Sequence, residues 1–175
     1  NNINYALIID EALSHKALRD DSGKTQTMSI EDMEAFKEWL VQERYTSKRY
    51  SYKGRKSAML VETLYITGSR ISAMFDVTWN DIKQIKDDFG NKTWVIHIIG
   101  KGNKSAKYPI TDLFYNKMRA ELFVGSEDDL VFKDISQRNF NNDMVRFAEE
   151  MGMEESFTPH SLRSLAITSV YKDTL

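Results

Sequence analysis

The chain has 175 residues, 41% of them hydrophobic and 29% charged, which is typical of one globular domain with a sizeable core. It contains no Cys and only three His, so we expect no disulfide, no metal site and no cofactor. The net charge of −2 argues mildly against a nucleic-acid partner, unless the basic residues cluster. Neither a membrane-spanning run nor a signal pattern is present, so we expect a cytoplasmic protein without a membrane partner.

The first part of the chain differs from the rest. Residues 1–18 carry apolar side chains at helical spacing, and residues 19–27 form a polar, linker-like break. We interpret residues 1–27 as the trailing segment and linker of a preceding region, and residues 28–175 as the main domain.

Helical signals dominate the next section. Ser29 and Asp32 resemble a capping box that opens a helix through about Tyr45. Residues 58–66 are apolar nearly all round and predict a central buried helix, with Gly68 as its left-handed C-cap.

The apolar period then changes to that of strands. Two connections rich in Asp, Gly and Asn separate three short apolar runs, which predicts an antiparallel meander. Helical spacing returns afterwards. The sequence therefore predicts a mainly α (α+β) fold with one small sheet. The expected strands are 82–86, 93–99 and 106–110, and the later helices 112–123, 137–151 and 157–170.

A basic stretch without acids occupies residues 44–56, interleaved with three tyrosines. A solvated loop and a phosphate-contacting edge with aromatic packing groups are both consistent with this pattern. Its basic members are Arg44, Lys48, Arg49, Lys53, Arg55 and Lys56.

A second candidate site lies near the end of the chain. Thr158 suits an N-cap and Pro159 the first helical position, so His160 and Arg163 share one face of the first turns. A helix N-terminus attracts anions, and a guanidinium there can bind phosphate oxygens in a bidentate manner. An exposed His and Arg on an ordinary amphipathic helix is the alternative interpretation.

Two further cations stand at positions that can serve chemistry. Arg70 follows Gly68 at the start of a short helix. The alternative interpretation is that this arginine has only a structural role or is exposed to solvent. Lys101 lies between two glycines at the tip of the second hairpin, where it either keeps the turn soluble or delivers a proton or charge into a groove.

Three motifs in this order resemble the tyrosine recombinases, the phage integrase family, over residues 28–175. Leu64–Ser72 resembles the first arginine box, with Val77–Ile82 like the segment that follows it. Ile99–Lys104 resembles the lysine hairpin, and Thr158–Arg163 resembles the H-x-L-R box.

The resemblance implies the fold of DNA breaking–rejoining enzymes and site-specific recombination or integration through a 3′-phosphotyrosine. Arg70 and Arg163 would clamp the two non-bridging oxygens of the DNA phosphate, and Lys101 would protonate the leaving 5′ oxygen. His160 would donate a hydrogen bond to the phosphate or assist the nucleophile. The partner would be double-stranded DNA. The full-length enzyme, from a phage or mobile element, would bind two DNA sites as a homotetramer. A DNA-binding region would precede the catalytic domain in that enzyme. The expected DNA contacts are Lys48, Arg49, Lys53, Arg55, Lys56 and Lys104.

Two departures from the family pattern stand out. Ala73 occupies the position of a common carboxylate, for which Asp76 is a partial substitute. Tyr171 is the only tyrosine after Arg163 and lies about 12 Å further along the helix, so we interpret it as a packing residue. We therefore expect an inactive, monomeric catalytic-domain fragment that ends before the nucleophile. A non-catalytic DNA-binding or assembly module and a type IB topoisomerase-like nicking-closing enzyme are the alternatives.

Overall fold

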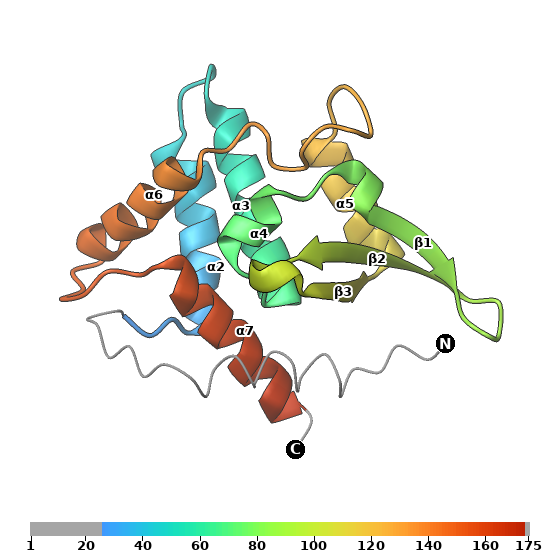
Figure 1. The fold of residues 1–175 in the computed structure, drawn as a ribbon. Coiled ribbons are helices and arrows are strands. Elements are labelled where there is room, and N and C mark those ends of the chain that lie inside the picture. The colour runs from blue at the N-terminus through green and yellow to red at the C-terminus, as the bar shows by residue number, and fades with distance from the viewer. Residues whose placement is uncertain (1–25, 174–175) are drawn as a thin grey trace.

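The computed structural model of the chain describes residues 26–173, with side chains as far as Ser169. The apolar segment 1–18 and nearly all of the break that follows it lie outside the described residues. The described part is mainly helical and contains one three-stranded antiparallel sheet (Figure 1), which confirms the predicted fold class.

The first described helix, α2, spans Ile30–Trp39 and begins at the predicted capping box. The Asp32 backbone N–H donates to Ser29 Oγ at 3.0 Å, and the Ser29 N–H donates to Asp32 Oδ2 at 2.9 Å. The chain then winds more widely through a π-helical turn, Leu40–Arg44, which the Tyr45 N–H closes on the Leu40 carbonyl at 3.2 Å. The predicted end near Tyr45 is thus correct, although the last turn is not α-helical.

The central helix α3 spans Ser51–Thr67 and is largely buried, as predicted. It begins seven residues earlier than the apolar run, because residues 51–56 of the basic stretch form its first turns. Gly68 ends it with φ 62°, a left-handed conformation that glycine adopts without steric cost. A short helix, α4, follows over Ile71–Phe75.

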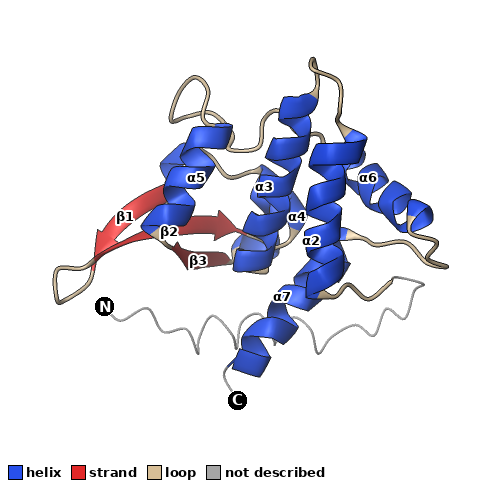
Figure 2. Ribbon diagram, turned by 180° about the vertical axis from the view of Figure 1, so that it is seen from behind, coloured by secondary structure: helices blue, strands red, loops and turns tan. Residues whose placement is uncertain are grey.

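The sheet has the order β1–β2–β3, with both neighbouring pairs antiparallel. Ile96 in the middle strand pairs with Ile82 on one side and with Tyr108 on the other. Helix α5, Asp112–Leu122, covers one face of this sheet (Figure 2). The three strands are β1 Ile82–Lys86, β2 Lys92–Ile99 and β3 Ser105–Ile110, within one residue of the predicted bounds.

Two helices complete the described chain, α6 over Gln137–Glu150 and α7 over Pro159–Asp173. Aromatic rings from two helices and a loop form the centre of one core: Phe36 contacts Phe140 and Phe147, and Phe147 stacks on Phe157. Helix α7 packs against α3, and its Ala166 and Ile167 lie next to Gly68 at the C-terminal end of α3. No helix among residues 26–173 is both long and apolar enough to cross a membrane.

Candidate DNA phosphate site

The end of α3, the start of α4, the β2–β3 connection and α7 come together in one region of the fold (Figure 1). Residues from all four line a surface pocket there. It brings together three of the four predicted catalytic residues, which are separated by up to 93 positions in the sequence. Its lining residues are Gly68, Ser69, Arg70, Ala73, Ile98, Gly100, Lys101, Lys104, Ser105, Ala106, Tyr108 and Arg163.

A short hydrogen-bonded turn presents Arg70 to this pocket. The Thr67 hydroxyl donates to the Thr63 carbonyl at 2.8 Å, and its oxygen lies 3.1 Å from Ser69 Oγ and 3.3 Å from the Ser69 backbone nitrogen. After this turn Arg70 is extended, with φ −70° and ψ 139°, and serves as the N-cap position of α4. The exposed Arg70 therefore stands on a backbone that Gly68 and two hydroxyl groups hold in place.

Arg163 reaches the pocket from α7 and is partly buried. Its Nε atom has no hydrogen-bond partner within the described chain. Burial lowers the pKa of the Arg163 guanidinium, the positive charge of Arg70 lowers it further, and Tyr108 acts in the opposite direction. An arginine remains charged at neutral pH, so the pocket holds two cations that repel each other.

The β2–β3 connection supplies the other two cations. Residues Lys101–Asn103 form a single 3-10 turn, and the Gly100 N–H donates to the Lys104 carbonyl at 2.7 Å to close it. Gly102 has φ 77° and Asn103 has φ 58°, so the turn depends on two left-handed residues between the two lysines. Lys101 and Lys104 are both exposed and both line the pocket.

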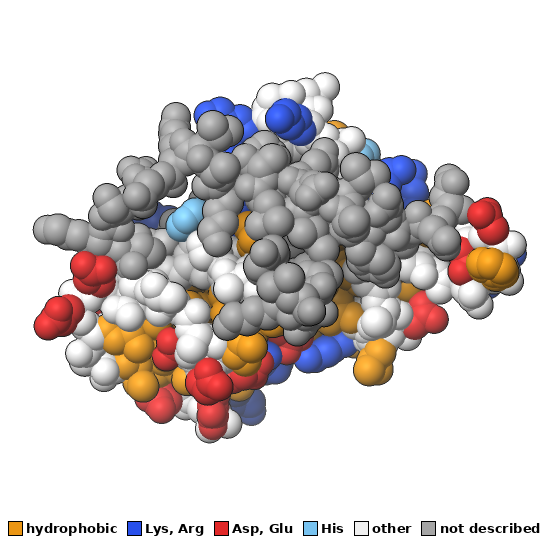
Figure 3. All heavy atoms as spheres, turned by 90° about the horizontal axis from the view of Figure 1, so that it is seen from below, with side chains coloured by type: hydrophobic (Ala, Val, Ile, Leu, Met, Phe, Trp, Pro, Cys, Tyr) orange, Lys and Arg blue, Asp and Glu red, His pale blue; other side chains and the backbone are white. Residues whose placement is uncertain are grey.

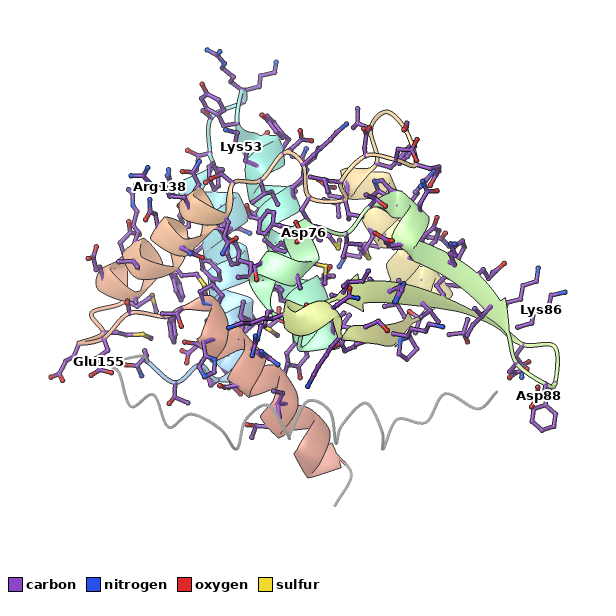
Figure 4. All side chains as sticks on the ribbon, viewed as in Figure 1. Lys53, Asp76, Lys86, Asp88, Arg138 and Glu155 are labelled. Atoms are coloured by element: carbon purple, nitrogen blue, oxygen red, sulfur yellow. The ribbon has the colours of Figure 1, made fainter. Side chains whose placement is uncertain are left out.

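No acid of the described chain lines the pocket. Ala73 lines it at 9% exposure, where a carboxylate was expected from the resemblance. Asp76 is exposed on the far end of α4 (Figure 4) and forms no ion pair with Arg70 in the described chain. The view from below in Figure 3 shows both acidic and basic side chains, the acidic ones mainly along the left, lower and right margins. The site is therefore a local concentration of positive charge on a chain whose net charge is −2.

His160 lies outside the pocket lining, and Thr158 does not have its predicted capping role. His160 is exposed on the first turn of α7 and does not line the pocket. The Thr158 hydroxyl does not cap the helix, because its oxygen is buried without a hydrogen-bond partner in the described chain. Instead, the Thr158 backbone N–H donates to Ser161 Oγ at 3.1 Å. The helix start is correct, but Ser161 supplies the side-chain hydrogen bond.

The predicted basic stretch separates into paired and unpaired cations. Lys56 is 8% exposed and forms an ion pair with Asp134, Arg44 Nε lies 2.7 Å from Asp143, and Arg55 Nε lies 2.9 Å from Glu121. Lys48, Arg49 and Lys53 form no ion pair with any residue that the structure describes. The burial of Lys56 does not fit the expected DNA contact, because its ammonium group is directed to a carboxylate.

Sequence reasoning missed three polar lining residues, Ser69, Ser105 and Tyr108. Tyr108 occupies β3, where the alternation of apolar and polar residues could have indicated which side chains share the face of Ala106. No comparable signal marks Ser69. Within residues 26–169, no group of three or more His, Asp or Glu side chains is placed to share a metal ion.

A profile of the phage integrase family matches residues 41–174 and thus covers most of the chain, including every residue of the pocket. The chain belongs to the phage integrase family.

Curated relatives are tyrosine recombinases. Tyrosine recombinase XerC of Bifidobacterium longum subsp. infantis is 25% identical over 172 residues, which cover 85% of this chain and 45% of the relative. Tyrosine recombinase XerD of Halalkalibacterium halodurans is 29% identical over 121 residues, covering 62% of this chain and 38% of the relative. This phage integrase family member thus spans less than half the length of these two relatives.

Solved structures show the same fold at low sequence identity. The XerH site-specific recombinase bound to a palindromic difH substrate superposes with a TM-score of 0.61 at 19% identity, over 90% of this chain and 45% of that one. The FLP recombinase–Holliday junction complex gives a TM-score of 0.59 at 15% identity, over 96% of this chain and 46% of that one. These similarities establish the recombinase catalytic fold for this family member.

Proposed function

We propose that this chain carries the phosphate-activating residues of a site-specific DNA recombinase that works through a 3′-phosphotyrosine. The observation that carries the proposal is the acid-free pocket in which Arg70, Lys101, Lys104 and Arg163 converge from three separate elements of the described chain. Two relatives of the same fold were solved as complexes with DNA, a difH substrate and a Holliday junction, which supports double-stranded DNA as the partner.

The proposed chemistry uses fixed positive charge. Attack by a tyrosine oxygen on the phosphorus forms a P–O(Tyr) bond and breaks the P–O5′ bond, so negative charge builds on the two non-bridging oxygens. Arg70 and Arg163 bind these oxygens, and charges aimed where charge develops usually make the largest catalytic contribution. Lys101 gives its proton to the leaving 5′ oxygen. The reverse step rejoins the strand without ATP, because the phosphotyrosine conserves the bond energy.

His160 stands one turn before Arg163, within reach of the same helix N-terminus, and we propose that it assists the phosphate or the nucleophile. We assign the nucleophile to no tyrosine of this chain. Tyr108 lines the pocket as part of β3, and the side chain of Tyr171 lies outside the described residues. We propose that strand transfer needs the whole recombinase, acting in the cytoplasm as a homotetramer on two DNA sites, and that this chain alone is an inactive monomer.

Cations outside the pocket complete the proposed DNA surface. Lys48, Arg49 and Lys53 are unpaired in the described chain, and Arg55 is half exposed despite its contact with Glu121. Lys56 is left out of the proposed contacts because Asp134 already neutralises it.

A covalent-trapping experiment tests the proposal. The protein encoded by the complete natural reading frame is incubated with a nicked suicide duplex carrying the flanks of its element, and SDS-resistant adducts are measured. The expected result is an adduct that Arg163→Ala abolishes and that Arg138→Ala, an exposed arginine of α6, leaves intact. An equal adduct yield with Arg163→Ala would contradict the assignment of Arg163.

The other outcomes separate the alternatives. Salt-sensitive DNA binding without any adduct would point to a non-catalytic DNA-binding or assembly module. An adduct accompanied by relaxation of supercoiled plasmid, but by no strand exchange between two sites, would point to topoisomerase-like nicking and closing.

A further inference from the structure

A compact group of cations lies at the end of α3 opposite the pocket, with Lys48 and Arg49 exposed and Lys53 partly buried. We call Lys48, Arg49, Tyr50 and Lys53 the cationic turn. The Arg49 guanidinium lies 5.3 Å from the centre of the Tyr50 ring, and Lys53 Nζ lies 5.1 Å from it. Tyr50 is itself 42% exposed. One exposed aromatic ring thus gathers two cations in fixed positions.

Neighbouring acids neutralise the cations on both sides of the cationic turn. Asp143, which is 2% exposed, accepts hydrogen bonds from Arg44 Nε at 2.7 Å and from the Tyr45 hydroxyl at 2.6 Å. Lys56 is paired with Asp134. Lys48, Arg49 and Lys53 form no ion pair in the described chain. The cationic turn therefore carries three uncompensated positive charges.

The backbone of the turn is well anchored. The Ser47 carbonyl accepts hydrogen bonds from the Tyr50 and Ser51 N–H groups, each at 2.9 Å. Gly54 allows the start of α3 to approach the π-helical turn, since a Cβ atom at this position would lie only 2.5 Å from the Leu40 carbonyl oxygen. A preorganised group of charges loses less conformational entropy on binding than a flexible loop does.

Helix α3 sets the separation between the cationic turn and the pocket. The helix has 17 residues and carries Lys53 of the cationic turn in its first turn, while its C-terminal end leads directly into Gly68 and Arg70. At about 1.5 Å per residue, the two surfaces are roughly 25 Å apart along the helix. Figure 4 labels Lys53 at one end of α3, and Figure 1 shows α7 near the other end of this helix. This distance is the rise of about seven base pairs at roughly 3.4 Å each.

We propose that the cationic turn is a second phosphate-binding surface, which holds the duplex backbone about seven base pairs away from the phosphate bound in the pocket. This inference rests on the proposed function, because it takes duplex DNA as the ligand of the pocket. The turn reads no bases, since its charged groups recognise phosphates. It extends the bound length of DNA beyond the site of reaction and orients the duplex along α3.

The test measures affinity as a function of DNA length. This chain is titrated with hairpin-closed, random-sequence duplexes of about 6, 10, 14 and 18 base pairs, with affinities corrected for the number of binding registers. The expected result is a step of roughly tenfold or more between the two shortest duplexes, because only the longer one reaches both surfaces. The triple variant Lys48→Ala/Arg49→Ala/Lys53→Ala should lose this step and lower the salt slope on the longer duplexes by about 2 to 3.

A matched triple variant controls for net charge. Lys83→Ala/Lys86→Ala/Lys92→Ala removes three exposed lysines of the β1–β2 hairpin, where Lys86 is labelled in Figure 4, and should keep the length step. A step that the cationic-turn variant retains would overturn the proposal and leave the turn for another partner, such as an acidic protein segment.

The shortest duplex separates this inference from the proposed function. Binding there depends on the pocket alone, so Arg163→Ala should weaken it while the cationic-turn variant should not. Loss of the length step with pocket binding intact would confirm the second surface. Pocket binding that does not depend on Arg163 would contradict the proposed function, whatever the length series shows.

Discussion

Arg163 and Arg70 place two guanidinium groups in one pocket, close enough for the charge of Arg70 to lower the pKa of Arg163. No carboxylate of the described chain lines the pocket to offset this repulsion. The free protein therefore carries an electrostatic cost that an anion removes on binding. A site with repelling cations that an anion neutralises is suited to bind the two non-bridging oxygens of a phosphodiester.

Removing one of these charges should stabilise the empty protein. We expect Arg163→Met to raise the free energy of unfolding by about 1 kcal/mol in low-salt buffer, because a half-buried cation next to another cation is replaced by an apolar chain. Thermal unfolding measures this, with Arg138→Met as the exposed control. Added phosphate should then raise the melting temperature of the parent more than that of Arg163→Met. A lower melting temperature for Arg163→Met without phosphate would show that the repulsion is not significant.

A carboxylate at position 73 should compete with the anion. Ala73 lines the pocket with Arg70, so we expect Ala73→Asp to form an ion pair and to weaken phosphate binding by roughly tenfold. Isothermal titration with inorganic phosphate measures the affinity, and Ala73→Asn separates charge from size. Equal affinities for the Asp and Asn variants would argue against a direct pairing with Arg70.

The Thr67 hydroxyl should influence phosphate binding by positioning Arg70. It connects the Thr63 carbonyl to Ser69, and we expect Thr67→Val to reduce phosphate affinity several-fold because the turn before Arg70 loses its side-chain hydrogen bonds. In an Arg70→Ala background the same change should have no further effect, whereas Thr67→Ser should restore affinity. Additive losses in this double-mutant cycle would indicate a general structural role for Thr67.

Glu62 should make the stability of the helical core dependent on pH. Burial of Glu62 favours its neutral form, but hydrogen bonds from Lys37 and Lys117 outweigh it and hold the pKa below its ordinary value of 4.5. A depressed pKa stabilises the folded state fully above the unfolded value and progressively less as the pH falls through the folded value. We expect Glu62→Gln to cost about 1–2 kcal/mol near pH 7 and clearly less near pH 3. Urea unfolding at the two pH values checks this, and a cost independent of pH would contradict it.

Gly54 should be intolerant of a side chain. A Cβ atom there would lie 2.5 Å from the Leu40 carbonyl oxygen, which is backbone and cannot rotate away. We expect Gly54→Ala to destabilise the fold by about 1–3 kcal/mol despite the better helix propensity of alanine. Gly90→Ala is the comparison, because a Cβ atom there would have no neighbour within 4 Å in the described chain. Gly90 has φ 82°, so its cost should come from the backbone alone and be smaller, as chemical denaturation of both variants will show.

The sequence by itself determined the elements and most of their ends. Ser29 and Asp32, Gly68 and the turns between the strands act on residues within about four positions, so their signals can be read along the chain. The order of the arginine, lysine and H-x-L-R motifs also indicated the family before any geometry was known.

Only the tertiary structure decided which cations are free to bind a ligand. Lys56, Arg55 and Arg44 have acidic partners that lie 66 to 99 positions away in the chain, so no local pattern separates them from Lys48, Arg49 and Lys53. The same holds for the pocket: α3 and α7 must pack against each other before Arg70 and Arg163 can share one anion. Local hydrogen bonding depends on neighbours in the sequence, whereas charge compensation depends on neighbours in space.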